Sequence, residues 1–360
     1  MWKLIVVVAV VAASCSSTAG TTTTSDPVAT TPTTTSGSTT TTTSTPAASP
    51  GPSGRRGHAM AALGDGRLLV VGGWTVASNA RTWLGDSWVY ETGTGTWTEV
   101  ESMPQRAHHA LAAGGGQVLL FGGYVGASEV YGDTRVFRDG EWDRLDDSGG
   151  PDGRAGAVLT YDNAAESFVL FGGDEEPLDA RIAEPETWIF ANESWTAVAV
   201  EESPAHLTEG HPVLFELALS YDTQSERVIL LIGGDETWAF ETATGTWEQR
   251  SAPDSAADFM IAAAYHAGLD RVIAYGGAPT AATQETWSYD YDSDSWGLIP
   301  TATSPGPIAD HAMAYDQATN AVYLFGGTDE PLGLGDPETP SAAMWAFDGS
   351  DWTLVWQPAD

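Results

Sequence analysis

Eight residues with charged or imidazole side chains recur at matching places in the repeated part of this 360-residue sequence. Alignment of the repeats puts four of them at one position, namely Arg56, Arg106, Arg154 and Asp258. Two residues further on, the same strand face presents His58, His108, Glu216 and Asp310. Arginines beside acids and histidines could bind a carboxylate, an acidic sugar or a metal ion of unknown identity. The alternative interpretation is structural, with these side chains bracing the turns between repeats.

Motifs for catalysis are largely absent. The sequence lacks Gly-x-Ser-x-Gly, His-Glu-x-x-His and a phosphate-binding glycine-rich loop, so no catalytic residue is assigned.

Calcium is the one cofactor left open, because Asp290, Asp292 and Asp294 have the spacing that begins a calcium loop. Ser295 and Thr301 stand where an EF-hand has glycine and glutamate, so a polar turn is the alternative. We therefore expect a binding protein rather than an enzyme.

The charge of the chain is strongly unbalanced. It has 49 acidic residues against 14 basic ones, which gives a formal net charge of 14 − 49 = −35. Such a chain repels phosphate polyanions, so we expect no nucleic-acid partner. The single lysine is Lys3, and every other cationic residue is an arginine. An acidic surface with so little lysine indicates adaptation to high salt, because salt screens the repulsion among the acidic residues. We prefer this interpretation to a binding function of the acidic surface.

The N-terminus has the features of a targeting signal. Lys3 precedes an apolar run, Leu4–Ala13, that is too short to span a bilayer. The sequence Ala12-Ala13-Ser14-Cys15 resembles the lipobox of bacterial lipoproteins, although that family usually has leucine where Ala12 stands. The resemblance implies that residues 1–14 are a signal peptide. It also implies that Cys15, the only cysteine, carries a lipid that anchors the secreted protein at the bacterial cell surface. A plain secretory peptide is the alternative.

A low-complexity segment follows the cysteine. Residues 16–53 contain 16 Thr, 8 Ser and 5 Pro in 38 positions and almost no apolar side chain. Such a segment cannot bury a core, so residues 15–53 are predicted to form a disordered stalk. The remaining residues, 54–360, have the composition of a folded domain.

Residues 54–360 repeat a pattern in which a short apolar run ends in two glycines. Apolar runs of this length are typical of strands that are buried on both faces. A glycine pair allows the positive φ and close backbone approach needed where such a strand ends. The six runs are Leu68–Val71, Val118–Phe121, Phe168–Phe171, Val228–Ile232, Val272–Tyr275 and Val322–Phe325. The pairs that follow them are Gly72-Gly73, Gly122-Gly123, Gly172-Gly173, Gly233-Gly234, Gly276-Gly277 and Gly326-Gly327.

A tryptophan marks the last strand of each unit, seven or nine residues after a Trp or Arg in the strand before it. This spacing suits a hairpin with a short turn, and a further strand precedes each glycine pair, so every unit is predicted to contain four antiparallel strands. The six tryptophans are Trp97, Trp142, Trp195, Trp247, Trp296 and Trp352. We expect them to pack between neighbouring units.

Four strands in about 50 residues, a Gly-Gly pair and a Tyr/Phe followed by Trp resemble the kelch repeat. The resemblance covers residues 54–360 and implies an all-β, six-bladed β-propeller. Its blades are expected at about 54–103, 104–150, 151–203, 204–252, 253–303 and 304–360. Each blade would be continuous in sequence, so packing rather than a shared strand would close the ring. Galactose oxidase has this fold but needs a cysteine in the propeller, and Cys15 lies outside it.

The resemblance also implies a function. A propeller at the cell surface is expected to be a monomeric binding or scaffolding module that recognises a protein or glycan at the cell envelope, with the lipid on Cys15 as its membrane contact. A sugar epimerase of the sialic-acid mutarotase type, which is also a kelch propeller, is the enzymatic alternative. A structural surface component is the third possibility.

Overall fold

The protein is described from a computed structural model, in which all described residues belong to the unit Ala47–Asp360. The described ranges are 50–77, 80–126, 129–146, 149–175, 186–204, 217–233, 236–253, 261–277, 283–329 and 339–359. Cys15, Glu216, Gly234 and Asp258 lie outside them. Within these ranges no helix is long and apolar enough to cross a membrane.

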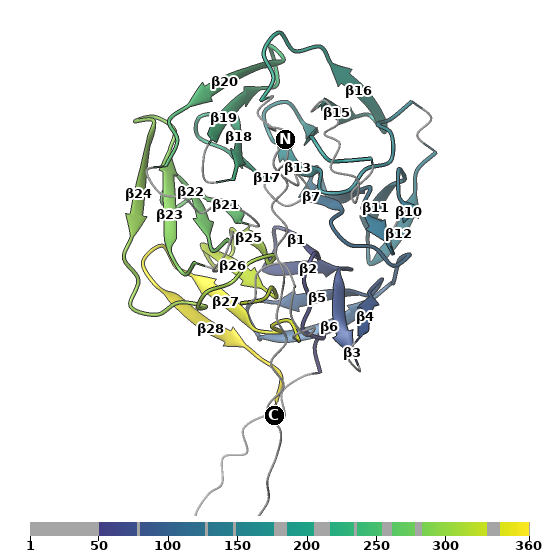
Figure 1. Cartoon of the computed structure of the whole chain (residues 1–360), viewed down its shortest axis with the longest axis vertical. Helices are drawn as coiled ribbons and strands as arrows, with labels where there is room; N and C mark the ends of the chain where they lie inside the picture. The colour runs from purple at the N-terminus through teal and green to yellow at the C-terminus, as the bar shows by residue number, and fades with distance from the viewer. Residues whose placement is uncertain are drawn as a thin grey trace, which may run out of the picture. The chain divides into compact units, whose positions relative to one another are not determined.

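Six four-stranded antiparallel sheets surround a central axis, as Figure 1 shows. Blade 1 consists of β1 (Ala59–Ala62), β2 (Arg67–Val71), β5 (Ser87–Glu91) and β6 (Thr96–Val100). Blade 2 consists of β7 (Ala110–Gly114), β8 (Gln117–Phe121), β11 (Thr134–Arg138) and β12 (Glu141–Arg144). Blade 3 consists of β13 (Val158–Asp162), β14 (Ser167–Phe171), β15 (Thr187–Ala191) and β16 (Ser194–Val198).

The other three blades have the same order. Blade 4 consists of β17 (Leu217–Asp222), β18 (Arg227–Ile232), β19 (Glu236–Glu241) and β20 (Thr246–Arg250). Blade 5 consists of β21 (Ala262–His266), β22 (Arg271–Tyr275), β23 (Thr286–Asp290) and β24 (Ser295–Ile299). Blade 6 consists of β25 (Ala312–Asp316), β26 (Ala321–Phe325), β27 (Met344–Phe347) and β28 (Trp352–Trp356). The predicted fold class, a six-bladed propeller with four strands in each blade, is confirmed.

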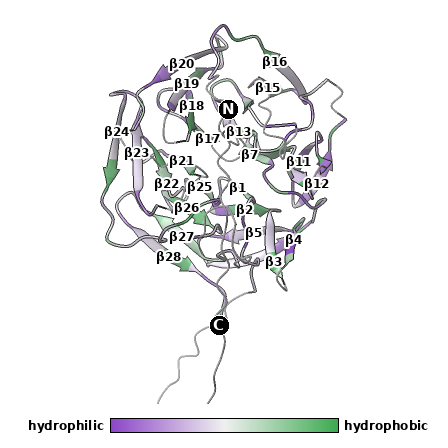
Figure 2. Ribbon diagram, in the orientation of Figure 1, coloured by the Kyte–Doolittle hydropathy of each residue, from purple (hydrophilic) through white to green (hydrophobic). Residues whose placement is uncertain are grey.

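The sequence pattern explains this arrangement. The second strand of each blade coincides with an apolar run, and these runs are almost fully buried. The outer strands alternate between exposed residues and a buried tryptophan, and Figure 2 shows the contrast between inner strands such as β7 and outer strands such as β20. The described glycines of all six pairs have positive φ, between 53° and 98°.

The glycine pair fixes each blade to the next one. A Cβ atom on Gly72 would lie 2.7 Å from the Arg106 carbonyl oxygen, and one on Gly122 would lie 2.3 Å from that of Arg154. The second glycine donates a hydrogen bond to the same oxygen, with 2.8 Å from Gly73 N to Arg106 O and 2.8 Å from Gly123 N to Arg154 O. Any side chain at the first glycine would therefore separate the blades.

The last-strand tryptophans pack between blades, as predicted. Five of them donate an indole hydrogen bond to a hydroxyl group on the first or second residue of the third strand of the preceding blade. The pairs are Trp142 with Ser87, Trp195 with Thr134, Trp247 with Thr187, Trp296 with Thr237 and Trp352 with Thr286. At the sixth junction this position holds Met344, and Trp97 packs against Phe325 and Trp356 instead.

Packing closes the ring where blade 6 meets blade 1. Each blade is formed by one continuous segment of the chain, as expected, with a small hairpin inserted between the second and third strands of blades 1 and 2. Residues before β1 add contacts at this junction that the sequence did not indicate. The backbone at Gly51 lies against Trp97 and Trp356, and the Arg55 amide donates a hydrogen bond to the Ser341 carbonyl (3.2 Å).

Two small hairpins were not predicted. They are β3 (Trp74–Ala77) with β4 (Ala80–Trp83) in blade 1, and β9 (Tyr124–Val125) with β10 (Glu129–Val130) in blade 2. Each follows a glycine pair and joins the second and third strands of its blade. Both lie on the face where the chain enters the inner strands, since β3 and β9 begin beside Arg56 and Ala107.

Candidate functional site

Arg106 and Arg154 are structural residues inside their blades. Arg106 is fully buried and forms a bidentate pair with Asp133, with nitrogen–oxygen distances of 2.8 and 3.1 Å. It also donates a hydrogen bond to the Gly122 carbonyl (2.9 Å). Arg154 forms the equivalent contacts with Glu186 and Gly172 at 2.8 and 3.2 Å. These two guanidinium groups therefore hold the glycine pair and the third strand of their own blades.

The counterpart of these arginines in blade 1 is Arg55, not Arg56. Arg55 binds both carboxylate oxygens of Asp86 at 2.8 Å and the Gly72 carbonyl at 3.1 Å. The predicted alignment of Arg56 with Arg106 and Arg154 is thus wrong by one residue, and the expected ring of three arginines does not form. A sequence signal for the pairing was present: an acidic residue stands two positions before the Trp or Arg of the third strand.

Arg106 should be essential for the fold rather than for binding. Arg106→Ala would leave Asp133 buried beside Arg135 alone, and removal of one partner from a buried pair typically costs about 3–5 kcal/mol. We expect a lower melting temperature, with partial recovery in the double variant Arg106→Ala/Asp133→Ala. A single variant that melts like the wild type would contradict this assignment.

His58 is also a packing residue. Its counterparts are His109 and His311, and all three are buried beside the first glycine of the preceding blade's pair. A Cβ on Gly326, Gly72 or Gly276 would lie 2.5–3.1 Å from the corresponding imidazole. Burial is the main cause that lowers the pKa of each, to about 4 for His311. The predicted alignment of His58 with His108 is therefore wrong.

These histidines should make the propeller sensitive to mild acid. Their folded-state pKa lies below the unfolded value near 6.5, so their contribution is complete above pH 6.5 and is lost as the pH falls towards 4. We expect the melting temperature to fall between pH 6.5 and 4.5, and His311→Phe should reduce this slope. An unchanged slope in the variant would contradict the assignment.

The structure brings three of the predicted site residues together at the mouth of the channel. Arg56 Nε lies 2.7 Å from one oxygen of Asp310, and His108 Nδ1 lies 3.8 Å from the other. The three residues come from blades 1, 6 and 2, directly before the inner strands β1, β25 and β7. Their side chains are only 8–9% exposed, so they form a nearly buried polar group that we call the mouth triad.

The mouth triad is held in an unusual backbone conformation. His108 and Asp310 have φ of 50° and 58°, and the equivalent residues in blades 1 and 3 are Gly57 and Gly156. Left-handed conformations of non-glycine residues cost about 1–3 kcal/mol and occur preferentially at functional sites. Burial lowers the pKa of His108, and the Asp310 carboxylate opposes this effect.

An aromatic wall stands beside the mouth triad. The Arg56 guanidinium carbon lies 4.8 Å from the ring centroid of Trp74, and Arg81 lies over the same ring at 4.2 Å. Tyr124 stacks on His108 with centroids 5.6 Å apart, and Trp83 meets Tyr124 edge-on at 5.1 Å. The wall comes from the two unpredicted hairpins, so sequence analysis missed Trp74, Arg81, Trp83 and Tyr124.

Arg81 is the accessible cation of this site. It is exposed, and in the part of the chain that the structure describes no carboxylate lies within ion-pair distance of it. Cation–π contact with Trp74 and Trp83 holds its guanidinium group beside the mouth triad. A carboxylate could bind Arg81 without displacing a partner from among the described residues.

The described residues do not form a metal site. No group of three or more His, Cys, Asp or Glu with suitable geometry occurs among them. His58 packs edge-on against Phe325, whereas His108 stacks on Tyr124, so the two histidines have different surroundings. At the spacing that left calcium open, Asp290 pairs with Arg271 (2.8 Å) and Asp294 accepts hydrogen bonds from Tyr289 and Ser251.

Similarity to known proteins agrees with this architecture. Residues 24–173 match the sequence model of the KLHDC2/KLHL20/DRC7 kelch-repeats domain. A stretch of 105 residues is 38% identical to the dynein alpha chain of the flagellar outer arm from Chlamydomonas reinhardtii, over 27% of this chain and 2% of that much longer protein. The solved structure of YjhT superposes with a TM-score of 0.61 at 14% identity, over 84% of this chain and 98% of that one.

At 14% identity the likeness to YjhT concerns the fold alone. Together with the six repeats and six four-stranded sheets, it defines the class of the protein. The chain is a six-bladed β-propeller, and its residues 24–173 match a kelch-repeats sequence model.

Proposed function

We propose that this propeller is a binding module that recognises a carboxylate-bearing glycan or protein segment at the mouth triad and aromatic wall. The observation that carries the proposal is the exposed Arg81 guanidinium, which rests on Trp74 and has no carboxylate partner among the described residues. Because the chain has a net charge of −35, most of its surface repels anions, and an accessible arginine marks a place where an anion could bind.

The surrounding contacts support the same ligand chemistry. Trp83 is partly exposed and offers a ring surface on which a sugar ring or an aliphatic segment could pack, and the buried Tyr124 supports it from behind. The Arg56–Asp310 pair is already satisfied at 2.7 Å, so it would fix the floor of the site. Arg81 would then supply the charge-assisted hydrogen bond to the ligand.

Binding should depend on Arg81 more than on any other exposed arginine. We expect a panel of glucuronate, galacturonate and N-acetylneuraminate to contain a ligand whose affinity falls at least about 10-fold in Arg81→Gln, since one charge-assisted hydrogen bond contributes roughly 1.5–3 kcal/mol. Arg144→Gln is the matched control, because Arg144 is an exposed arginine on the outer strand β12. Titration calorimetry on the full chain measures both affinities.

An equal loss of affinity in Arg81→Gln and Arg144→Gln would show that only the net charge of the protein matters for binding. If the wild type binds none of the acids, the proposal is refuted. Glucose, which has no carboxylate, serves as the uncharged reference ligand.

A sugar epimerase is the second candidate, and the pair of His108 and Asp310 favours it. An imidazole with a lowered pKa is neutral near pH 7 and can accept a proton, and the carboxylate 3.8 Å away could orient it. Proton NMR of the same samples distinguishes the two functions. Accelerated anomeric exchange that is lost in His108→Gln would select the enzyme, whereas saturable binding without exchange would select the module.

We further propose that the module is anchored at the cell envelope through a lipid on Cys15. The lipobox-like sequence Ala12–Cys15 and the Thr/Ser/Pro-rich stretch after it support this location. Metabolic labelling with a fatty acid should mark the wild type and leave Cys15→Ser unlabelled. A wild type that takes up no acyl label and accumulates in the medium would show that the anchor is wrongly assigned.

A further inference from the structure

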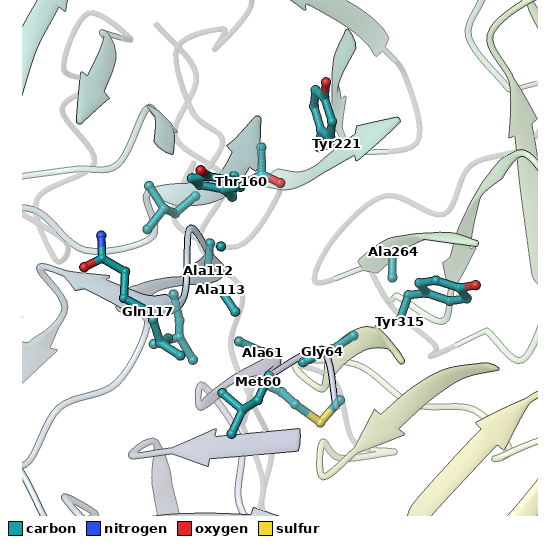
Figure 3. Close-up of a pocket in the computed structure, with 18 of the residues that line it drawn as sticks. Met60, Ala61, Gly64, Ala112, Ala113, Gln117, Thr160, Tyr221, Ala264 and Tyr315 are labelled. Carbon is teal, nitrogen blue, oxygen red and sulfur yellow. The ribbon is translucent and has the colours of Figure 1, made fainter. Parts of the chain in front are cut away.

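The central channel and the gaps between neighbouring blades are different kinds of opening. All six inner strands contribute side chains to the channel, and Figure 3 labels one or more from each, including Ala61, Ala112, Thr160, Tyr221, Ala264 and Tyr315. Each gap, by contrast, is formed by one pair of blades. Its residues can therefore depart from the repeat without a change in the rest of the ring.

The tryptophan in the gap between blades 4 and 5 is less well covered than its counterparts. Trp296 is partly exposed, whereas the last-strand tryptophans of the other five blades are at most 7% exposed. Trp296 borders a cleft of about 20 Å³ that is also lined by Glu236, Pro253, Ile261 and Trp287. A single water molecule needs about 10–15 Å³, so the cleft has room for a small flat group rather than for a sugar ring.

Blades 1 and 3 show what the fold places beside the equivalent third-strand tryptophan. In blade 1, Asp86 accepts a hydrogen bond from the Trp88 indole (2.7 Å) and forms a bidentate pair with Arg55. In blade 3, Glu186 accepts hydrogen bonds from the Trp188 indole (2.9 Å) and from a buried arginine (2.8 Å). The acid before the third strand thus binds one indole and one guanidinium group.

Blade 5 has the acid and the indole but not the arginine. The Trp287 indole nitrogen lies 3.1 Å from a carboxylate oxygen of Glu285. No arginine or histidine within the described ranges lies at ion-pair distance from Glu285, since the arginines of blades 4 and 5 pair elsewhere. The sequence has Asp258 at the position of Arg154, so blade 5 supplies no guanidinium group of its own there.

The second contact of the missing arginine is supplied from within blade 5. In blades 1, 2 and 3 the buried arginine also donates a hydrogen bond to the carbonyl of the first glycine. In blade 5 the Thr283 hydroxyl donates to that carbonyl, on Gly276, at 2.9 Å. A guanidinium group from outside the chain would therefore have to satisfy only Glu285.

An exposed apolar side chain stands beside this acid and indole. Leu298 on β24 is the cross-strand neighbour of Trp287 and is 49% exposed. The corresponding residues of blades 1, 2 and 4 are polar, namely Glu99, Arg144 and Gln249. Charged side chains normally protect an outer strand from pairing with another chain, and β24 contains none.

We propose that the gap between blades 4 and 5 binds an arginine side chain of a partner protein. The guanidinium group would pair with Glu285 in the manner of the buried arginine in blade 3, while its aliphatic stem lies against Trp287. An apolar residue next to the arginine would cover Leu298. The Glu236 carboxylate and the net charge of −35 attract a cationic segment to this place.

The planar fork of arginine suits the site better than the ammonium group of lysine, because a carboxylate and a flat cleft match its shape. The site contains no residue of the mouth triad or of the aromatic wall. It therefore does not depend on the function proposed for them.

Short blocked peptides test this site on the full-length protein. The peptide Ac-Gly-Leu-Arg-Leu-Gly-NH₂ carries the arginine and two apolar neighbours, and its citrulline analogue has the same shape without the charge. We expect titration calorimetry to show at least 10-fold weaker binding of the citrulline peptide, and weaker binding of the lysine peptide than of the arginine peptide. Equal binding of any two of the three peptides, or no binding of the arginine peptide, would overturn the proposal.

The variant Glu285→Gln locates the site. Glutamine keeps an oxygen that can accept the Trp287 hydrogen bond but removes the charge, so the affinity for the arginine peptide should fall at least 10-fold. Glu99→Gln is the matched control, because it removes one exposed carboxylate from the outer strand of blade 1, and it should bind as the wild type does. Arg81→Gln should also bind the peptide normally, which separates this test from that of the mouth.

A second variant covers the case in which Glu285→Gln lowers the melting temperature. Leu298→Gln introduces the residue that blade 4 has at this exposed position, and it should weaken peptide binding at least about 3-fold through the loss of apolar burial. Unchanged affinity in the folded variants of Glu285 and Leu298, or an equal loss in Glu99→Gln, would refute the proposal.

Discussion

The close contact between each glycine pair and the next blade is the constraint on which the other features of the propeller depend. The first glycine has room for a hydrogen atom only, because a carbonyl oxygen of the following blade lies 2.3–2.7 Å from its Cβ position in four blades. The second glycine binds the same oxygen, so the position of the next inner strand is fixed before that strand begins. The buried arginine of blades 1, 2 and 3 then links the glycine carbonyl to an acid directly before the third strand.

This constraint also determines what the mouth can contain. The residues between the bound carbonyl and the inner strand have to turn sharply, and one of them adopts positive φ in blades 1, 2, 3 and 6. Blades 1 and 3 use glycine there, whereas His108 and Asp310 accept the strained conformation in blades 2 and 6. Blades 2 and 6 therefore place polar side chains at a turn where blades 1 and 3 have glycine. As a result, polar residues gather on the part of the mouth that blades 6, 1 and 2 form.

The repeat was predictable from the sequence because its signals are local. An apolar run, a glycine pair and a tryptophan at a fixed distance each report on burial or backbone conformation at their own position, and every described one lies where expected. The mouth was not predictable in the same way. Arg55, Arg56, His58 and His108 precede β1 and β7, so the alternation of strand side chains does not apply to them. Gly57 and His108 adopt positive φ and form a tight turn, so the residues around them do not follow strand geometry. An alignment of the repeats that is wrong by one residue therefore confuses a buried structural arginine with a residue at the mouth.

The acidic surface, the buried ion pairs and the exposed Arg81 respond differently to salt. Ions screen exposed charges over about 10 Å at 0.1 M salt but have little effect on pairs that are buried. The pairs Arg106–Asp133 and Arg56–Asp310 have side chains at most 9% exposed, so their geometry should persist at ionic strengths that neutralise the repulsion among surface carboxylates. Arg81 differs from these buried pairs, because it is exposed and its attraction for an anion weakens as salt rises. Adaptation to salt would therefore require the ligand proposed for the mouth to contact an aromatic ring as well as the charge, and the partly exposed Trp83 beside Arg81 offers that contact.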